Sequence, residues 1–287
     1  MPTVSVVIPT YNCAAYLDEA IGSVLNQSFH DFDIIVVDDG STDHTAAVLA
    51  RYDSLPNFRV IRKSNGGPSS GRNAGIAASA AEFVAFLDGD DLLDPHTLEL
   101  LVQAAGASQA SWCVCDVVRF NESFRESQAS PIPADGEYLA GILTDNFVER
   151  GMFFRREVFA RVGPWPEHLR TREDWELFIR LIEKREPFAY VAEPLYLYRR
   201  REGSLTKGAT LPVMRDTLHV LRTHHLRLAR QGNRTAARIF AAHAWGLARR
   251  FVYEHRQWGD GLWCAWHSMR QDFRWQRILH PILHHTR

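Results

Sequence analysis

The strongest constraint on the fold of this chain is a buried strand that ends in a cluster of acids. Five apolar residues, Phe83 to Leu87, stand in a row, and Asp88, Asp90 and Asp91 follow directly. A short apolar run between polar residues is typical of a strand buried on both faces of a parallel sheet. Because ligands of open parallel sheets bind beyond the carboxyl ends of the strands, we expect these acids to face a binding crevice.

The acids themselves indicate a bound cation. Crowded carboxylates repel one another, so such a cluster is costly unless a cation neutralises it. Hard divalent cations prefer oxygen ligands, and Mg²⁺ commonly combines few carboxylates with water and phosphate oxygens. We therefore expect a divalent metal, Mn²⁺ or Mg²⁺, that bridges the protein to a diphosphate. The alternative is a solvated turn that caps the next helix; it explains Asp94 and Pro95 but neither Asp88 nor Asp90.

Apolar runs and helical patterns alternate along the first 120 residues. Strands are expected at 4–8, 34–37, 58–61, 83–87 and 112–118, with helices between them at 17–25, 45–52, 70–79 and 97–105. This alternation predicts an α/β fold with a right-handed, mostly parallel sheet that helices cover on both faces. Asp38 and Asp39 end the second strand, so they are expected at the same sheet edge as the acids at 88–91.

A second chemical signal lies at Glu173-Asp174, where two acids open a helix predicted over 175–184. A carboxylate held there could act as a general base for an attacking hydroxyl. Acids are also common in first helical turns for electrostatic reasons alone, and the spacing leaves both interpretations open. Residues 66–73 resemble a phosphate loop, but Arg72 and Asn73 replace its Lys and Ser/Thr, which excludes a P-loop ATPase.

Five motifs in order resemble a family 2 glycosyltransferase of the GT-A fold. They are Val-Val-Ile-Pro-Thr-Tyr-Asn at the start, Val-Val-Asp-Asp-Gly-Ser-Thr-Asp at 36–43, Arg-Asn-Ala-Gly at 72–75, Leu-Asp-Gly-Asp-Asp at 87–91 and Glu-Asp-Trp-Glu at 173–176. The resemblance covers roughly residues 2–206. It implies a glycosyltransferase domain over 1–208, with a nucleotide-sugar half at 1–120 and an acceptor half at 121–208.

The resemblance also implies roles for individual residues. Asp90, with Asp88, would hold the metal, and Asp174 would be the catalytic base. A nucleotide base would bind Asp39, supported by Asp38. The chain departs from the family near the end of the last strand, where the family often has a His and this sequence has Arg199 to Arg201. Arginine cannot ligate a cation, so we expect these residues to neutralise the diphosphate directly, and the third protein ligand of the metal stays open. The residues implied to bind substrate are Pro9, Thr10, Tyr11, Asp38, Asp39, Arg72, Asp88, Arg199 and Arg201.

These signals together predict an inverting transferase that moves a sugar from a nucleotide diphosphate sugar, with a leaning to UDP, to a hydroxyl acceptor. A lipid-linked saccharide in surface polysaccharide or glycolipid synthesis is one such acceptor. Two rivals are considered. A nucleotidyltransferase would need Lys or Arg near its N-terminal loop, and residues 2–33 contain neither. A nucleotide-sugar-binding module without turnover would not need Asp88, Asp90 and Asp174 together.

Charge separates the region 209–287 from the rest of the chain. Residues 210–287 contain thirteen Arg, no Lys and four acids, a net charge of +9, against −10 for 1–209. Five of the eight Trp lie in the last 43 residues. The composition fits a helical region that contacts an anionic membrane surface, packs on the protein or forms a homo-oligomer; nucleic acid is disfavoured because no binding motif is present.

The sequence also gives expectations about location. No apolar run approaches the roughly 20 residues that span a bilayer. No signal-peptide pattern opens the sequence, and four cysteines without metal-type spacing fit a reducing compartment. We therefore expect a cytoplasmic protein, free or peripheral on the cytoplasmic face of the membrane.

Overall fold

The computed structural model describes residues 1–148, 150–201 and 210–271. The chain divides into two compact units. Unit 1 comprises residues 1–142 and 146–205, and unit 2 comprises 143–145 and 206–287. The domain boundary expected between residues 208 and 209 lies outside the described residues.

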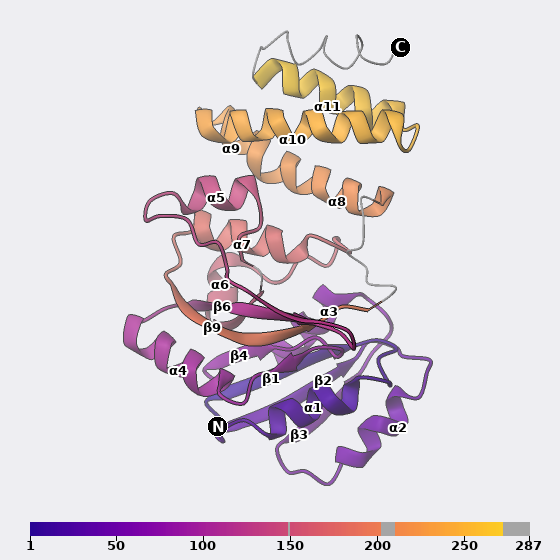
Figure 1. The fold of residues 1–287 in the computed structure, drawn as a ribbon, viewed down its shortest axis with the longest axis vertical. Helices are drawn as coiled ribbons and strands as arrows, with labels where there is room; N and C mark the ends of the chain where they lie inside the picture. Colours follow the sequence, from indigo (N-terminus) through magenta and orange to yellow (C-terminus); the bar gives the residue numbers. More distant parts are fainter. Residues whose placement is uncertain (149, 202–209, 272–287) are drawn as a thin grey trace. The chain divides into compact units, whose positions relative to one another are not determined.

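Unit 1 is built around one mixed sheet (Figure 1). The described residues supply nine strands in the order β3-β2-β1-β4-β8-β6-β9-β5, and β7 pairs with β6. The strands are β1 (Val4–Thr10), β2 (Phe32–Asp38), β3 (Phe58–Arg62), β4 (Phe83–Phe86), β5 (Leu92–Leu93), β6 (Trp112–Phe120), β7 (Arg125–Gln128), β8 (Arg150–Arg155) and β9 (Phe188–Arg199).

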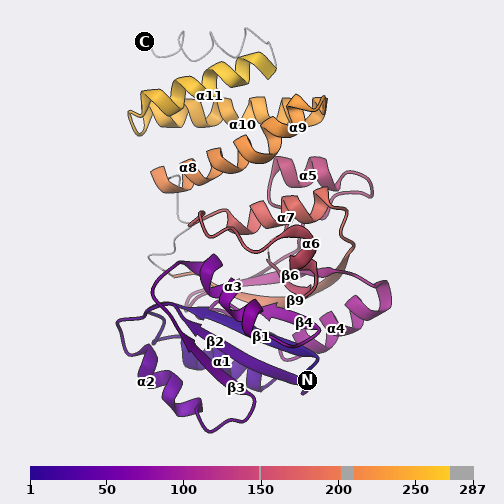
Figure 2. The same cartoon turned by 180° about the vertical axis from the view of Figure 1, so that it is seen from behind.

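The first four strands confirm the predicted parallel sheet. β1 lies between β2 and β4, β3 pairs with β2, and all three pairings are parallel (Figure 2). Val6, Val7 and Ile8 on β1 are fully buried, as are Ile34 to Val37 on β2. Strands covered on both faces need near-continuous apolar runs, which explains why these segments were recognisable in the sequence.

Helices pack on this sheet and connect its strands. In unit 1 they are α1 (Leu17–Leu25), α2 (Thr45–Leu49), a 3₁₀ turn (Ala50–Tyr52), α3 (Pro68–Ala78), α4 (Thr97–Ser108), α6 (Val158–Val162) and α7 (Glu173–Glu183), together with α5 (Tyr138–Thr144) except for its last two residues. α3 approaches β1 very closely, since a Cβ built on Gly75 would lie 2.2 Å from Val7 Cγ1. The glycine of the Arg-Asn-Ala-Gly motif therefore sets the spacing between helix and sheet.

The second half of the sheet differs from the sequence prediction in three places. β8, which was not predicted, inserts antiparallel between β4 and β6 and makes the sheet mixed. The sequence of residues 121–136, rich in Glu, Ser, Gln, Pro and Asp, is typical of a surface loop, but this segment contains β7. The sequence pattern predicts two short strands, near 188–191 and 195–198, but the structure has one strand, β9, whose register with β6 shifts around Asp116. A strand with such an irregularity reads as two in the sequence.

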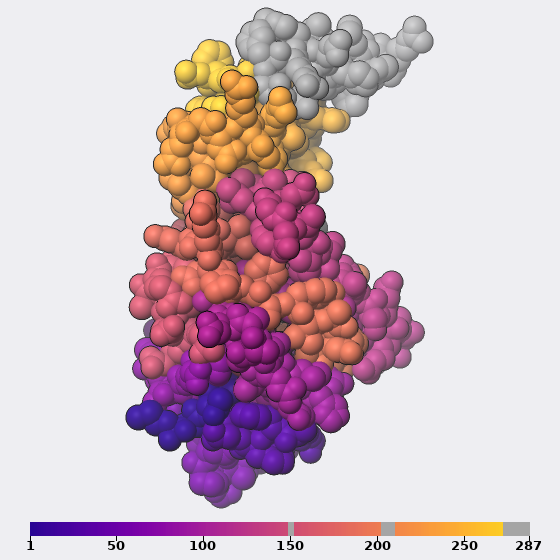
Figure 3. Space-filling model, turned by 90° about the vertical axis from the view of Figure 1, so that its left-hand side faces the viewer, coloured from indigo at the N-terminus to yellow at the C-terminus, as the bar shows by residue number. Residues whose placement is uncertain are grey.

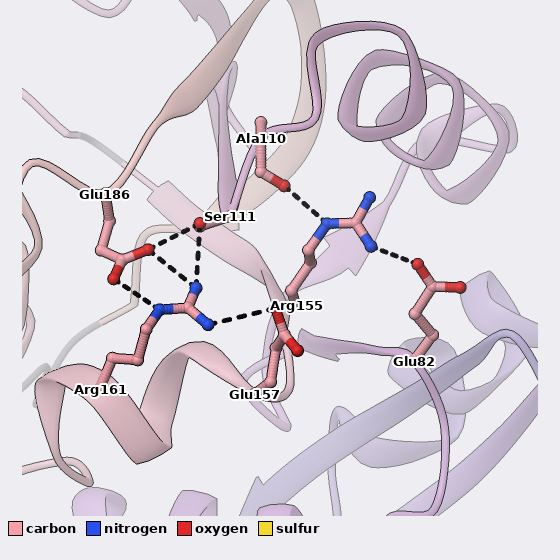
Figure 4. Close-up of polar contacts among 7 residues, drawn as sticks. All are labelled: Glu82, Ala110, Ser111, Arg155, Glu157, Arg161 and Glu186. Carbon is pink, nitrogen blue, oxygen red and sulfur yellow. Dashed lines mark hydrogen bonds and ion pairs between the residues drawn. The ribbon is translucent and has the colours of Figure 1, made fainter.

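A polar network fastens β8 and α6 at the amino end of β4, away from the acid cluster (Figure 4). Arg155 donates to the Ala110 carbonyl at 3.1 Å and pairs with Glu82. Arg161 donates to Glu186 at 2.7 Å, and the same carboxylate accepts from Ser111. A hollow at this end is lined by Ala81, Glu82, Arg155, Arg156 and Glu157. Because its charged residues are of both signs and the Arg155 guanidinium is already paired, this network is structural.

Unit 2 is helical, and its described residues 210–271 are the orange to yellow spheres in Figure 3. Its described helices are α8 (Leu211–Val220), a π-helical turn (Leu221–His225), α9 (Leu226–Arg230), α10 (Arg234–Tyr253) and α11 (Trp258–Gln271). The Asn233 side chain caps α10 by accepting from the Ala236 amide at 2.9 Å. The helical region expected over 209–287 is confirmed for the described residues, including α11. None of the helices in 1–148, 150–201 or 210–271 combines the length and apolarity needed to cross a bilayer.

Candidate active site

The carboxyl ends of β1, β2 and β4 meet at one edge of the sheet. The Asp39 amide donates to the Thr10 carbonyl at 2.9 Å, and the Leu87 amide donates to Val7 at 3.0 Å. The acid loop lies directly on β1, because a Cβ built on Gly89 would come within 2.9 Å of Thr10 Oγ1. Glycine between Asp88 and Asp90 therefore lets the two acids project beside the end of β1.

Pro9, Thr10 and Tyr11 close β1 at this edge. Thr10 is buried, whereas Tyr11 is 47% exposed and offers an aromatic face to solvent. Pro9 contacts α3, since a Cβ on Gly71 would lie 3.0 Å from Pro9 Cβ. An exposed aromatic side chain at the carboxyl edge of a sheet is suited to stack on a planar base.

The two acids after β2 are both buried and have protein partners. Asp38 accepts from the Ser41 amide at 2.9 Å. The Asp39 carboxylate accepts from the amides of Gly66 and Gly67, at 2.7 Å for the shortest bond, and from Lys63 Nζ at 2.6 Å. The glycine pair that resembled a phosphate loop in the sequence thus binds a carboxylate of this chain. A direct contact of Asp39 with a nucleotide base stays a prediction.

Arg72 connects the acid loop to the start of α7. Its side chain is 3% exposed and donates to Asp88 at 2.8 Å and to Glu173 at 2.9 Å. The guanidinium also lies over the Trp165 ring, 4.6 Å from its centroid. Its Nε is buried and has no hydrogen-bond partner among the described residues. The two carboxylates raise the pKa of Arg72 against the effect of burial, so this residue is a permanent cation between them.

Asp174 and Glu173 open α7 after an uncommon backbone turn. Arg172, which precedes them, has φ +62° and ψ 11°, the left-handed region that non-glycine residues rarely adopt. Asp174 is half-buried and accepts from the Asn146 side chain at 3.3 Å and from the Trp175 amide at 2.7 Å. Burial, reinforced by the neighbouring Asp174 charge, raises the pKa of Glu173, although Arg72 opposes the shift.

Asp90 is held by two arginines from the end of β9. Arg201 Nε donates to Asp90 Oδ2 at 2.5 Å, and Arg199 Nε donates to the Asp90 carbonyl at 2.9 Å. Both guanidinium groups lie near the Tyr16 ring, at 5.1 Å for Arg199 and 5.7 Å for Arg201. Burial lowers the pKa of Arg201, but the Asp90 charge, the hydrogen bond to Asp90 and weaker effects of Cys13 and Tyr16 together leave the pKa raised. The structure thus places both predicted arginines at the acid cluster.

Asp91 has a different part from the other two acids. It is fully buried and accepts from the Tyr196 hydroxyl and from the Arg199 amide, both at 2.8 Å. The Tyr196 hydroxyl in turn accepts from the Asp88 amide at 3.2 Å. Asp91 therefore holds the end of β9 at the acid loop and so determines the position of Arg199 and Arg201.

The donor set can accommodate a divalent cation. In the described residues no group of three or more His, Cys, Asp or Glu side chains surrounds a common point. Mg²⁺ does not need such a cage, because one or two carboxylates with phosphate oxygens and water are sufficient. Asp88 and Asp90 are 24% and 20% exposed, and each ion pair with arginine involves one carboxylate oxygen. A carboxylate accepts at both of its oxygens, so an arginine and a metal can share it.

Several residues of this edge were missed in the sequence. Lys63, Trp165, Tyr196 and Asn146 each contact a predicted site residue. Lys63 directly follows the edge strand β3, and such a position at the carboxyl end of a parallel strand was a usable signal. The other three lie in the half of unit 1 where the sequence pattern was irregular, and no spacing connected them to the site.

The fold and these residues define a GT-A glycosyltransferase, and comparisons with known proteins give the family. The model for "Glycosyl transferase family 2" matches residues 5–163, and the chain belongs to this family. The crystal structure of S. aureus TarS 1-349 aligns with a TM-score of 0.71 over 93% of this chain and 80% of that chain, at 20% identity. The same protein in complex with UDP-GlcNAc gives 0.67 over 92% and 81%, at 22% identity.

Curated relatives are similar over parts of their length. The uncharacterized glycosyltransferase EpsJ of Bacillus subtilis is 29% identical over 76% of this chain and 67% of its own length. The uncharacterized glycosyltransferase alr2836 of Nostoc sp. is 36% identical over 56% and 53%, and the minor teichoic acid biosynthesis protein GgaA of B. subtilis is 29% identical over 69% and 47%. The chain thus spans about half the length of the last two.

Proposed function

We propose that this protein is an inverting glycosyltransferase that moves a sugar from a UDP-sugar to a hydroxyl acceptor. One observation carries the proposal: Arg72 joins Asp88 directly to Glu173, the neighbour of Asp174. The candidate donor site and the candidate base are therefore one side chain apart, on a rigid frame. This is the arrangement that transfer between two bound substrates requires.

Asp174 is the general base of this proposal. It opens α7, whose apolar side is anchored by Trp175 and Phe178, both buried. Its carboxylate takes the acceptor's proton as the acceptor oxygen attacks the anomeric carbon from the side opposite the diphosphate, which inverts the configuration. Asn146 holds one carboxylate oxygen and thereby orients the other.

The leaving diphosphate is stabilised by positive charge at the acid loop. Asp90 and Asp88 would hold Mn²⁺ or Mg²⁺, which when bound neutralises the charge that develops on the diphosphate. Arg199 and Arg201, already at Asp90, add fixed positive charge at the same place. Support for a UDP-sugar is the TarS complex with UDP-GlcNAc, and support for a polysaccharide or teichoic-acid type of acceptor is the likeness to GgaA.

The substitution Asp174→Asn tests the base. The isostere keeps size and position but removes basicity, so we expect transfer to fall by about a hundredfold or more while UDP affinity stays unchanged. Glu173→Gln is the matched comparison on the same turn. If Glu173→Gln abolishes transfer and Asp174→Asn does not, the wrong acid has been assigned. Full-length protein that binds UDP-sugars but neither transfers nor hydrolyses them would favour a binding module instead.

The substitution Asp90→Ala tests the metal. Thermal stabilisation by UDP with Mn²⁺, relative to UDP alone, is expected to disappear in the variant, since the bridge between protein and diphosphate is lost. Ligand binding at a hundredfold excess over Kd stabilises the folded state by about 2.7 kcal/mol, which is readily measured. Undiminished Mn²⁺-dependent stabilisation of the variant would remove Asp90 from the metal site.

A further inference from the structure

The apolar side of α11 faces away from the helix it packs on. Its buried positions are occupied by small residues, Gly261, Cys264 and Ser268. A Cβ on Gly261 would lie 2.5 Å from Val252 Cγ2, and the Ser268 hydroxyl donates to the Ala241 carbonyl at 2.7 Å. Both partners belong to α10, so the side of α11 against α10 is the side with the small residues.

The large apolar residues of α11 lie on its outer side. Trp258, Leu262 and Trp266 are 62%, 63% and 57% exposed. Residues four apart share one face of a helix, so these three form a single stripe, called here the α11 stripe. A surface helix of a globular protein normally has the reverse arrangement, with its large apolar residues towards the core. A contiguous exposed apolar stripe of this kind marks a contact surface.

Trp263 is a tryptophan of the same helix that contacts other residues of unit 2. The Arg222 guanidinium lies 3.7 Å from its ring centroid, and its ring stacks on His267 with 3.9 Å between the centroids. It therefore has partners within unit 2. The two tryptophans of the α11 stripe are more exposed, although they lie on the same helix.

Charge decides which partner fits the α11 stripe. Residues 210–271 contain ten Arg, no Lys and three acids, a net charge of +7. Arg256 is exposed in the turn just before the stripe, and Arg270 is exposed at the next four-residue step after Trp266. One of the three acids, Asp260, lies 3.8 Å from Arg215. A second copy of residues 210–271 would bring a charge of +7 against +7, whereas an anionic lipid surface complements both the arginines and the apolar stripe.

We propose that α11 binds an anionic membrane surface, with the α11 stripe in the boundary between headgroups and acyl chains and with Arg256 and Arg270 at the lipid phosphates. Tryptophan is favoured at this depth because its ring is apolar and its N–H can still reach water. The helix lies in the plane of the interface and does not span the membrane. The inference does not rest on the transferase reaction, because its test measures binding to lipid.

The test is sedimentation of the full chain with vesicles of phosphatidylcholine alone and of phosphatidylcholine with one quarter phosphatidylglycerol. The wild type is expected to sediment with the anionic vesicles. Less of it should sediment at high salt, because the Debye length decreases and the attraction between arginines and lipid phosphates weakens. Trp258→Ala/Leu262→Ala/Trp266→Ala should weaken the partition by on the order of a hundredfold. Arg256→Gln/Arg270→Gln should weaken it by about fivefold per arginine.

Matched controls distinguish binding through the α11 stripe and its arginines from a general effect of substitution or of lost charge. Trp258→Phe/Trp266→Phe keeps the apolar surface and should retain most of the binding. Arg51→Gln removes an exposed arginine of unit 1 and should leave it unchanged. Alanine is the best helix former, so the triple alanine variant should melt no earlier than the wild type.

Three results would overturn the proposal. One is a wild type that ignores anionic vesicles. Another is a triple alanine variant that melts early, because the stripe would then be packed within the protein. The third is a wild type that self-associates in sedimentation velocity while the triple variant stays monomeric, because the stripe would then join two copies.

Discussion

Asp88 and Asp90 are two positions apart and each pairs with an arginine, but the two pairs differ in burial and in what they connect. Arg72, the partner of Asp88, has a side chain that is 3% exposed and also binds Glu173 on α7. Arg201, the partner of Asp90, is 34% exposed and follows the end of β9. The two carboxylates are similarly exposed, so the difference lies in the arginines: Arg72 is buried inside unit 1, whereas Arg201 is partly exposed.

This difference separates a structural pair from an exchangeable one. Removing one partner of a buried ion pair costs several kcal/mol of stability, because the remaining charge is left without a countercharge and without full hydration. An exposed pair contributes about 1 kcal/mol or less, because solvent screens it. Arg72 is therefore expected to hold α3, the acid loop and α7 together, while Arg201 can leave Asp90 for a diphosphate at little cost.

The largest effect is expected for Arg72→Ala. Asp88 and Glu173 would then face each other without a countercharge, and the free energy of unfolding should fall by about 3–5 kcal/mol. Urea denaturation at neutral pH measures it. The control is Arg59→Ala, which removes an exposed partner of Asp33 and should cost about 1 kcal/mol or less. Equal losses in the two variants would show that Arg72 is not a structural tie.

The next effect is expected for Gly89→Ala, at the turn between the two pairs. The new Cβ would lie 2.9 Å from Thr10 Oγ1 and 3.1 Å from Thr10 Cβ, so the acid loop must shift away from β1. Overpacking of this kind costs about 1–3 kcal/mol. Gly106→Ala in α4, where nothing lies within 4 Å, should instead stabilise the protein by about 0.5–1 kcal/mol. A Gly89→Ala variant as stable as the wild type would show that the loop can move freely.

The parallel part of the fold could be predicted from the sequence because burial on both faces leaves a simple signal. The apolar runs at 34–37 in β2 and 83–86 in β4 are uninterrupted, and the run at 4–8 in β1 is interrupted only by Ser5. β7 was missed because β6 is its one partner among the described strands and three of its four residues are exposed and polar. β8 was missed because antiparallel insertion depends on pairing with β4 and β6, which are distant in the sequence.

Many residues of the candidate site could be named from the sequence, but the contacts between them could not. The acids at 88–91 and 173–174 stood out because each group ends a strand or opens a helix. Arg72 and Glu173 are 101 positions apart in the sequence, and no local pattern encodes a contact over such a separation. The same holds for Tyr196, whose hydroxyl reaches the acid loop only because β9 pairs with β5.

A smaller effect concerns the pH dependence of the buried pair. Burial and Asp174 raise the pKa of Glu173, so the folded state holds this proton more tightly than the unfolded state does. The resulting stabilisation is present below the ordinary Glu pKa of 4.5 and is lost as pH rises through the folded value. Glu173→Gln stays neutral, so its stability relative to the wild type should rise with pH from about 4 upwards. A difference that is constant with pH in urea titrations would contradict the shift.

The smallest effect on stability, and the sharpest contrast with Arg72, is expected for Arg201→Ala. Because the Arg201–Asp90 pair is partly exposed, its loss should change the free energy of unfolding by about 1 kcal/mol or less. UDP affinity should fall by about tenfold or more, since a charge-assisted bond to phosphate is worth about 1.5–3 kcal/mol. Arg200→Ala is the matched control, because Arg200 is the residue next to Arg201, is exposed and carries the same charge. If both variants bind UDP equally, Arg201 acts only through its general charge. If Arg201→Ala unfolds as readily as Arg72→Ala, the distinction between the two pairs is wrong.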